Sequence, residues 1–349
     1  MRKTFDEVFE DRTKYGTKVK TDEYKECGAH IIIDQGQEQI AGYTDLEEGL
    51  LEEVPAIIFG DHTRVIKYVD EPFFLGADGV KVLRSKYENA NYKYLYYALK
   101  NANIPNTGYN RHFKWLKEVA IECPDMDKQA EIVDILDRVT AVIEDRKQEL
   151  QKLEKLIKAR FVEMFGDPTL NTKGYPIKML PKIAEYWNGL TYKPEDVAEE
   201  GTIVLRSSNI QNAQLDFADT VRVNCKIGEK KFVQNNDILM CSRNGSARLV
   251  GKVALIQNID EPMSFGAFMM IIRSEYYQYL MTYFQMPAFR TQIATGATTT
   301  INQITGKMLD AVKLPVPNLC EISEFSVFCK QIDKSRLGKY LMRHNYLKV

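Results

Sequence analysis

Two polar loops that contain glycine carry side chains suited to molecular recognition. The first loop covers residues 106–114 and the second covers residues 298–307. Arginine pairs well with guanine, asparagine and glutamine pair with adenine, and threonine, lysine or main-chain amides bind phosphate. The composition of both loops therefore suits contacts to the base edges and phosphates of a nucleic acid.

Two further clusters of the same composition occur in the second half of the chain, at residues 206–209 and 242–248. Loops are commonly polar, so no single segment decides the matter. Polar loops occupy equivalent places in the two halves, but their sequences differ. This combination is expected of two domains that bind different target sequences. The candidate DNA contacts are Asn110, Arg111, His112, Lys114, Arg206, Ser207, Asn209, Arg243, Asn244, Arg248, Thr299, Asn302 and Gln303.

Catalytic signatures are lacking in the sequence. It has no phosphate-binding Gly-x-x-x-x-Gly-Lys-Ser/Thr loop, no Asn-Pro-Pro-Tyr-type methyltransferase motif and no glycine fingerprint for a nucleotide cofactor. Its four histidines have no zinc-site spacing. Asp216 with 229–231 is distantly similar to a nuclease metal site, and 60–63 contains an Asp-His pair, but both segments suit polar turns better. We therefore expect no catalytic residue, cofactor or metal.

The positions of these loops follow from an internal repeat. Residues 3–8, 84–85 and 116–124 return in the same order as residues 178–183, 273–274 and 309–317, at offsets between 175 and 193. A period this long indicates two similar domains and not a solenoid array. Short apolar segments bounded by glycine, such as 56–60 and 237–240, predict strands in both halves, and each half also contains a helix. The fold class expected is α+β, with two similar strand-rich domains.

A single long helix is predicted between the halves, at residues 125–165. Eight of its ten seam positions are apolar, which indicates a coiled coil with another helix. The seam positions are 132, 136, 139, 143, 146, 150, 153, 157, 160 and 164. Asp125 or Asp127 can cap its start, and Gly166 with Pro168 ends it. Such a helix is a rod of about 60 Å; the alternative is an amphipathic helix packed on a globular core.

Composition excludes several classes of protein. The chain has 349 residues, enough for two domains, and its net charge of −1 means that nucleic-acid binding must rest on local basic patches. No apolar run approaches the length of a membrane span, and the acidic N-terminus does not resemble a signal peptide. Six scattered cysteines suggest reduced thiols in a cytoplasmic protein.

The chain resembles the specificity (S) subunit of type I DNA restriction–modification systems. The resemblance extends over nearly the whole chain. Its most telling segments are 33–37, 57–63, 74–79, 106–109, 161–168, 205–210, 237–245 and 298–303.

The resemblance implies two target-recognition domains, at 1–124 and 166–317, separated by long coiled-coil helices at 125–165 and 318–349 in a pseudo-two-fold repeat. Each domain would bind one half of a split site in double-stranded DNA. The helices would set the gap and dock methyltransferase (modification) subunits, and restriction subunits would join the complex. On this hypothesis the chain is not an enzyme, because catalysis belongs to its partners.

The chain departs from the family pattern at its end. The distal segment lacks a sustained seam and contains Gly338, which predicts a shortened distal helix. Two other hypotheses remain. The chain could be a stand-alone nuclease or methyltransferase with an unrecognised site, or a coiled-coil interaction protein with no role on DNA.

Overall fold

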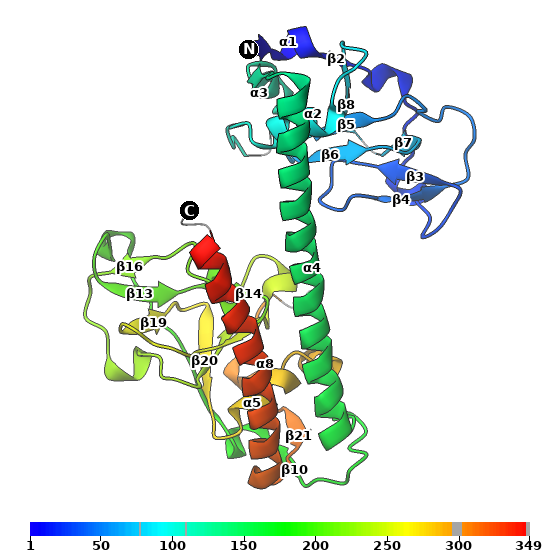
Figure 1. Ribbon diagram of the computed structural model, residues 1–349. Coiled ribbons are helices and arrows are strands. Elements are labelled where there is room, and N and C mark those ends of the chain that lie inside the picture. The colour runs from blue at the N-terminus through cyan, green and yellow to red at the C-terminus, as the bar shows by residue number, and fades with distance from the viewer. Residues whose placement is uncertain (77, 109, 295–301, 347–349) are drawn as a thin grey trace. The chain divides into compact units, whose positions relative to one another are not determined.

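The computed structural model describes residues 1–76, 78–108, 110–294 and 302–346 (Figure 1). The chain forms two compact units, Met1–Arg146 and Lys147–Val349, which we call unit 1 and unit 2. Both mix strands and helices, and the helix α4 (Met126–Phe165) begins in unit 1 and ends in unit 2. The expected α+β class, with a long helix between strand-rich domains, is confirmed.

Unit 1 contains two small sheets and a separate strand pair. Its sheet orders are β2-β8-β5-β6 and β4-β3-β7, and β1 pairs with β9. The strands are β1 (Arg2–Thr4), β2 (Phe9–Asp11), β3 (His30–Ile33), β4 (Gly42–Thr44), β5 (Ala56–Gly60), β6 (Ile66–Val69), β7 (Phe73–Leu75), β8 (Val80–Ser85) and β9 (Ala120–Glu122). The helices are α1 (Phe5–Val8), α2 (Tyr92–Lys100), α3 (Phe113–Lys117) and the first part of α4.

The central strand β5 explains how unit 1 is layered. All five of its residues are buried, because both faces of its sheet are covered. Ala56 and Ile58 pack in the cluster that includes β3 and β7, whereas Ile57 and Phe59 pack against the helices. Successive strand residues point to opposite faces, so a continuous apolar segment is needed to fill both layers.

Unit 2 repeats this arrangement. Its sheet orders are β11-β20-β17-β18 and β12-β16-β13-β19, with β10 paired to β21 and β14 paired to β15. The strands are β10 (Ile177–Met179), β11 (Glu185–Asn188), β12 (Val197–Ala198), β13 (Thr202–Leu205), β14 (Ile210–Gln211), β15 (Gln214–Leu215), β16 (Arg222–Val223), β17 (Ile238–Cys241), β18 (Val253–Leu255), β19 (Met263–Phe265), β20 (Met269–Arg273) and β21 (Lys313–Pro315). The helices are α5 (Tyr277–Tyr283), α6 (Pro287–Ala294), α7 (Gly306–Asp310), α8 (Leu319–Tyr346) and the end of α4.

Strand register shows how the two copies correspond. In unit 1, β3 and β7 are parallel and pair Ile33 with Leu75. In unit 2, β13 and β19 are parallel and pair Leu205 with Phe265. The next main-chain bond also recurs, since the N–H of Gly76 donates to Ile33 and the N–H of Gly266 donates to Leu205. The repeat seen in the sequence is therefore a repeat of topology.

The helix α4 begins and ends as its capping residues predict. The N–H of Lys128 donates to the side chain of Asp125 over 2.8 Å, which caps the first turn. At the other end, Gly166 has a φ of +76°, the left-handed conformation that glycine adopts most readily. The observed 40-residue helix agrees with the predicted one to within one residue.

Burial along α4 follows the predicted seam near both ends, where positions 132, 136, 153, 157, 160 and 164 are half-buried, and departs from it in the middle. Val139, Ile143 and Leu150 are exposed. The most deeply buried residues are Phe161 and Phe165, each of which follows a predicted seam position by one residue. An α-helix has 3.6 residues per turn and drifts from a 3.5-residue repeat, so packing against a globular core selects a different stripe.

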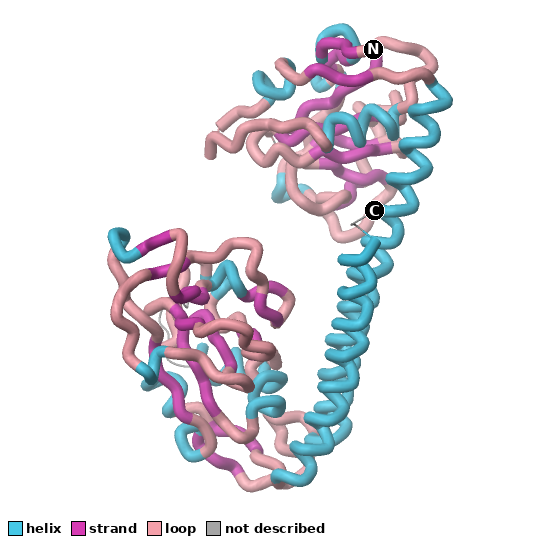
Figure 2. The backbone as a smooth tube through the Cα atoms, turned by 60° about the vertical axis from the view of Figure 1, so that its left-hand side comes forward, coloured by secondary structure: helices cyan, strands magenta, loops and turns pink. Residues whose placement is uncertain are grey.

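In unit 2 the end of α4 packs against α8 (Figures 1 and 2). The ring of Phe325 lies 5.7 Å from that of Phe161 and 5.3 Å from that of Phe165. Tyr175, beyond the end of α4, donates a hydrogen bond to Glu321 near the start of α8 over 2.8 Å. The two helices therefore run antiparallel here. The backbone of α8 continues through Gly338 for a total of 28 residues.

Candidate nucleic-acid interface

Four loops of unit 2 meet beyond the ends of strands β13, β17 and β19. We call residues 206–209, 242–248, 266–268 and 302–305 loop junction 2. The N–H of Ile304 donates to the carbonyl of Ser242 over 2.7 Å, and Arg243 and Gln303 form an antiparallel β-bridge. The N–H of Asn244 donates to Asn302 over 3.3 Å. The structure therefore brings together predicted residues from two segments far apart in the sequence.

Both the main chain and the side chain of Arg243 contact Phe268 at this junction. Its N–H donates to the carbonyl of Phe268 over 3.1 Å, and its guanidinium carbon lies 5.3 Å from the centre of the Phe268 ring. Arg243 is exposed, and Phe268 keeps 59% of its surface exposed. Phe268 is not among the residues predicted from the sequence, although an aromatic residue two positions after Gly266 was a usable signal.

Asn244 and Ser207 contact each other. The Asn244 amide donates to the hydroxyl of Ser207 over 3.1 Å, and its side-chain oxygen accepts from the N–H of Ser246 over 3.0 Å. These bonds connect the loop after β13 to the loop after β17. Both side chains therefore shape the junction, whereas Arg248, Asn302 and Gln303 are exposed around it.

Arg206 is neutralised within the protein. Its Nη2 donates to both carboxylate oxygens of Asp219, over 2.9 and 2.8 Å. A guanidinium already paired with a carboxylate offers less to a phosphate or base. Arg206 therefore contacts DNA only if that ion pair is rearranged.

Asn209 does not reach the surface. It is 1% exposed, and its amide donates to the carbonyls of Asp216 and Asp219, each over 2.8 Å. Its side-chain oxygen accepts from the N–H of Arg206. Asn209 thus organises the turn η5 (Ser207–Asn209), and its prediction as a DNA contact is corrected. Thr299, also predicted, lies outside the described residues.

Unit 1 builds the same kind of junction. We call residues 34–36, 60–64, 78–79 and 110–113 loop junction 1. The N–H of His112 donates to the carbonyl of Asp61 over 2.8 Å, and the N–H of Asp61 donates to Gly79 over 2.7 Å. In loop junction 2 the matching bonds are Ile304 to Ser242 and Ser242 to Phe268. The main-chain connections are equivalent, so the side chains distinguish the junctions.

Arg111 is a highly exposed predicted residue of loop junction 1, with 81% of its side chain accessible. Its Nε lies 4.0 Å from a carboxylate oxygen of Asp61. Asp61 is buried, and its other carboxylate oxygen accepts from the N–H of Phe113 over 2.7 Å. Asn110 and Lys114 are also exposed, so these two and Arg111 can reach a ligand.

His112 has no exposed surface. Its ring nitrogens face the carbonyl of Asp61 at 3.0 Å and the hydroxyl of Thr107 at 3.3 Å. The imidazole therefore connects loops inside unit 1. The prediction of His112 as a DNA contact is corrected, because a buried ring cannot meet a base edge.

Gln35 lies in loop junction 1 beside Gly79, the residue that corresponds to Phe268. Its amide donates to the carbonyl of Asp78 over 2.8 Å, and its side-chain oxygen accepts from the N–H of His62 over 3.1 Å. Gly79 has a φ of +92°, and a Cβ added there would lie 2.7 Å from the Gln35 amide. Gln35 thus excludes from unit 1 a side chain corresponding to Phe268.

A shallow basic groove borders loop junction 1 and was missed in the sequence. It is lined by Asp11, Thr13, Lys14, Gly16, Lys18 and Lys81. The ammonium of Lys81 lies 4.7 Å from the ring centre of Phe113, which places the groove beside the junction. Lys18 pairs with Asp78 over 2.6 Å and lowers the pKa of that carboxyl. Lys81 pairs with Asp11 over 2.9 Å, so Lys14 is the lysine of the groove best suited to a phosphate oxygen. Lysine clustering at residues 14–20 was the available signal.

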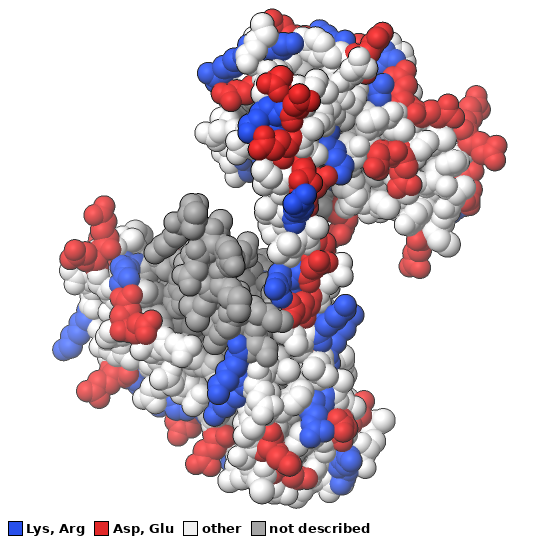
Figure 3. All heavy atoms as spheres, viewed as in Figure 1, with Lys and Arg blue, Asp and Glu red and all other residues white. Residues whose placement is uncertain are grey.

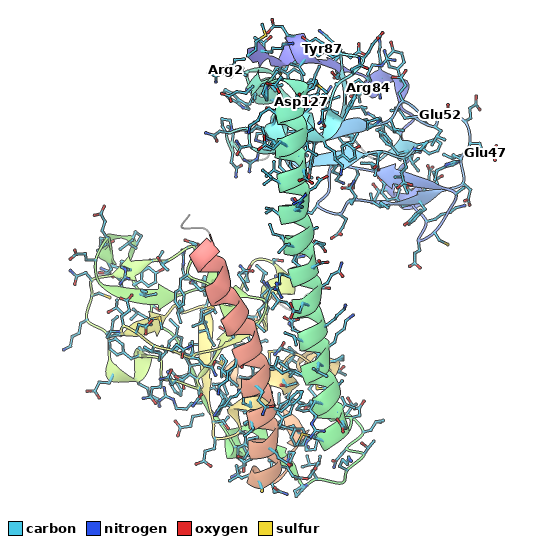
Figure 4. All side chains as sticks on the ribbon, viewed as in Figure 1. Arg2, Glu47, Glu52, Arg84, Tyr87 and Asp127 are labelled. Carbon is cyan, nitrogen blue, oxygen red and sulfur yellow. The ribbon has the colours of Figure 1, made fainter. Side chains whose placement is uncertain are left out.

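Several acidic side chains of unit 1 gather along one edge (Figure 3). Figure 3 shows Asp and Glu along one edge of unit 1, and Figure 4 labels Glu47 and Glu52 there. Both belong to the exposed loop that follows β4. Phosphate repulsion disfavours DNA at this edge.

The described ranges contain neither a cluster of metal ligands nor a membrane-spanning helix. Among those residues no three His, Cys, Asp or Glu side chains are grouped so that they could hold a metal ion. No helix in the described part of the chain is long and apolar enough to cross a membrane.

Comparison with known proteins relates the chain to one family. Residues 2–155 match the family model described as the type I restriction modification DNA specificity domain. The chain is 25% identical over 336 residues to the type I restriction enzyme EcoR124I/EcoR124II specificity subunit of Escherichia coli, covering 90% of this chain and 81% of that protein. It is 28% identical over 158 residues to the StySPI specificity subunit of Salmonella potsdam, covering 43% and 34%.

A solved structure supports the fold. The type I restriction–modification S subunit from M. genitalium superposes with a TM-score of 0.50 at 16% identity, over 100% of this chain and 95% of that one. At this level of identity the likeness concerns the arrangement of helices and strands.

Proposed function

We propose that this chain, which is related to the specificity subunits of type I restriction–modification systems, reads DNA sequence for such a complex. Each unit would contact one half of a bipartite site in double-stranded DNA. The relationship agrees with the resemblance that the motifs indicated. The boundaries 1–124, 125–165, 166–317 and 318–349 remain our proposed division into recognition domains and helices.

The observation that carries this proposal is the pair of loop junctions. Both use the same main-chain bonds, from His112 to Asp61 and from Ile304 to Ser242. Asparagine stands two residues before the donor in both junctions, as Asn110 and Asn302, but the exposed residue between differs, since Arg111 precedes His112 and Gln303 precedes Ile304. A constant scaffold with variable polar side chains is suited to reading two different base sequences.

Phosphate contacts would come from the cations around each junction. Lys14 lines the groove of unit 1 and Arg248 is exposed in unit 2, and neither has a carboxylate partner among the described residues. Contacts of this kind hold a duplex in register without reading its sequence. Their local placement reconciles DNA binding with a net charge of −1.

The middle of α4 offers a surface for protein partners. Val139, Val142, Ile143 and Leu150 are between 38% and 58% exposed and recur at helical spacing. An apolar stripe of this kind suits burial against another protein. We assign it to the modification subunits, with restriction subunits joining the complex and the assembly acting in the cytoplasm. The variant Val142→Asp should lose co-purification with the modification subunit but still bind DNA; retained co-purification would overturn this assignment.

The proposal treats the chain as a non-catalytic subunit, in keeping with relatives named as specificity subunits. The competing hypothesis is a stand-alone nuclease or methyltransferase. Purified chain should therefore transfer no methyl group from labelled S-adenosylmethionine to DNA and leave plasmid uncut in Mg²⁺. Turnover without partners would favour the enzyme.

The direct test is selection of bound duplexes from a randomised library. We expect two short motifs separated by a constant gap. Exchange of residues 1–124 for the same segment of a relative with another target should change one motif and leave the other motif intact. Recovery of duplexes with no common motif would contradict sequence recognition.

A further inference from the structure

We propose that Arg243, supported on the ring of Phe268, reads a guanine in the half-site bound by unit 2. The inference rests on the proposed function and adds the base that is read and the residue that positions its reader. Phe268 is a positioning residue, because it acts through Arg243.

The backbone of Arg243 is fixed on two sides. Its N–H donates to Phe268, and its main chain pairs with Gln303 across the β-bridge. The carbonyl of Phe268 also accepts from the N–H and the hydroxyl of Ser242, each over 2.9 Å. A base-reading side chain on a fixed backbone loses less conformational freedom on binding.

The side chain of Arg243 is supported by the aromatic ring. Its guanidinium carbon lies 5.3 Å from the ring centre, within the range of a cation–π contact. The ring stays 59% exposed. Among the described residues Arg243 forms no ion pair with a carboxylate, in contrast to Arg206 and Arg273. The guanidinium donors thus remain available, unlike those of Arg206, which bind Asp219.

Guanine is the base that fits these donors. Its major-groove edge presents two acceptors, O6 and N7, that match two parallel N–H groups of arginine. Lysine has neither this planar fork nor the same stacking on an aromatic ring. The pairing therefore explains why arginine and an exposed phenylalanine occur together at this position.

Unit 1 lacks this device at the equivalent position. Gly79 takes the place of Phe268, His62 takes the place of Arg243, and Gln35 fills the space. The two junctions therefore differ in the side chain presented at one shared place. We expect the two half-sites to differ at the corresponding base.

Selection from a randomised duplex library with the full chain tests this inference. Wild type should yield a guanine in the motif of unit 2 that Arg243→Ala and Arg243→Lys no longer select, with binding to the wild-type duplex reduced roughly 5- to 150-fold by the alanine variant. Arg248→Ala, in the same loop, is the matched control and should keep the guanine preference. Retention of the guanine by both Arg243 variants would overturn the assignment.

Variants of Phe268 test the positioning role separately. Phe268→Leu should lower the preference for guanine about 2- to 5-fold, and Phe268→Tyr should restore it, because only an aromatic ring provides the cation–π contact. Equal preference in the leucine and wild-type proteins would remove Phe268 from the mechanism. If wild type itself selects no motif, the proposed function fails; if it selects a motif that Arg243 does not influence, only this inference fails.

Discussion

Arg243 and Gln303 face each other across a β-bridge in unit 2, and His62 and Arg111 hold the corresponding places in unit 1. The correspondence follows from the equivalent main-chain bonds, which are accepted by Asp61 in unit 1 and by Ser242 in unit 2. His62 directly follows Asp61, and Arg243 directly follows Ser242. Arg111 and Gln303 each directly precede the donating residue. Of these two facing places, each junction has an arginine at one, and the two arginines lie on opposite loops. Two copies of one scaffold thus present their strongest base-reading side chain at different positions.

Arg111→Ala should weaken binding to the selected duplex by about 1–3 kcal/mol and relax one base position of the unit 1 motif. The reason is that 81% of the Arg111 side chain is accessible at loop junction 1. Titration of cognate and scrambled duplexes measures the effect. Arg138→Ala, on α4, is the control, because Arg138 pairs with Asp134 over 2.8 Å away from the junction. Equal losses on both duplexes would argue for a phosphate contact.

Lys14→Ala should weaken binding to all duplexes to a similar degree. Lys14 lines the basic groove and is assigned to phosphate contact. Loss of one such contact should reduce the slope of log affinity against log salt by about 1. Binding isotherms at several salt concentrations report the slope. A changed motif at constant slope would show base contact at this position.

Asp237→Asn should destabilise unit 2 by about 3 kcal/mol, because it leaves a partly buried guanidinium without its charge partner. Asp237 is 1% exposed, and its two carboxylate oxygens accept from Arg273, each over 2.7 Å. Asp219→Asn is the matched control: its ion pair with Arg206 is exposed and should contribute about 0–1 kcal/mol. Urea denaturation measures both, and similar losses would contradict the role of burial.

Phe161→Ala should cost about 3–5 kcal/mol of stability in unit 2. The Phe161 ring is fully buried and lies 4.9 Å from the ring of Tyr279 and 5.7 Å from that of Phe325. Val162→Ala is the control one residue along the same helix, where the side chain is 44% exposed, and should change stability by less than about 0.5 kcal/mol. Hydrogen exchange in α8 should accelerate in the first variant alone.

Alkaline pH should weaken unit 2 partly through Tyr175. Burial and the hydrogen bond to Glu321 raise the pKa of Tyr175 to about 12, against about 10 in an unfolded chain. A raised pKa means that the folded state holds the proton more tightly. This contribution is therefore complete below about pH 10 and is lost as the pH rises through about 12. Stability should fall less steeply in Tyr175→Phe, as urea midpoints across this pH range would show; identical slopes would contradict the assignment.

The sequence predicted the features that depend on neighbouring residues. Glycine-bounded apolar segments identified strands such as β5 and β17, because a strand covered on both faces must be apolar throughout. Asp125 and Gly166 marked the ends of α4, because capping is local chemistry. The repeated segments and the polar loops also needed no knowledge of tertiary contacts.

The tertiary structure decided which of the predicted residues can reach a ligand. His112 and Asn209 have suitable side chains but are buried, and Arg206 is neutralised by Asp219. Phe268 became significant only when the fold placed its ring under Arg243. Burial and pairing depend on residues far apart in the chain, so composition identifies where the loops are and the packing determines which of their side chains are available.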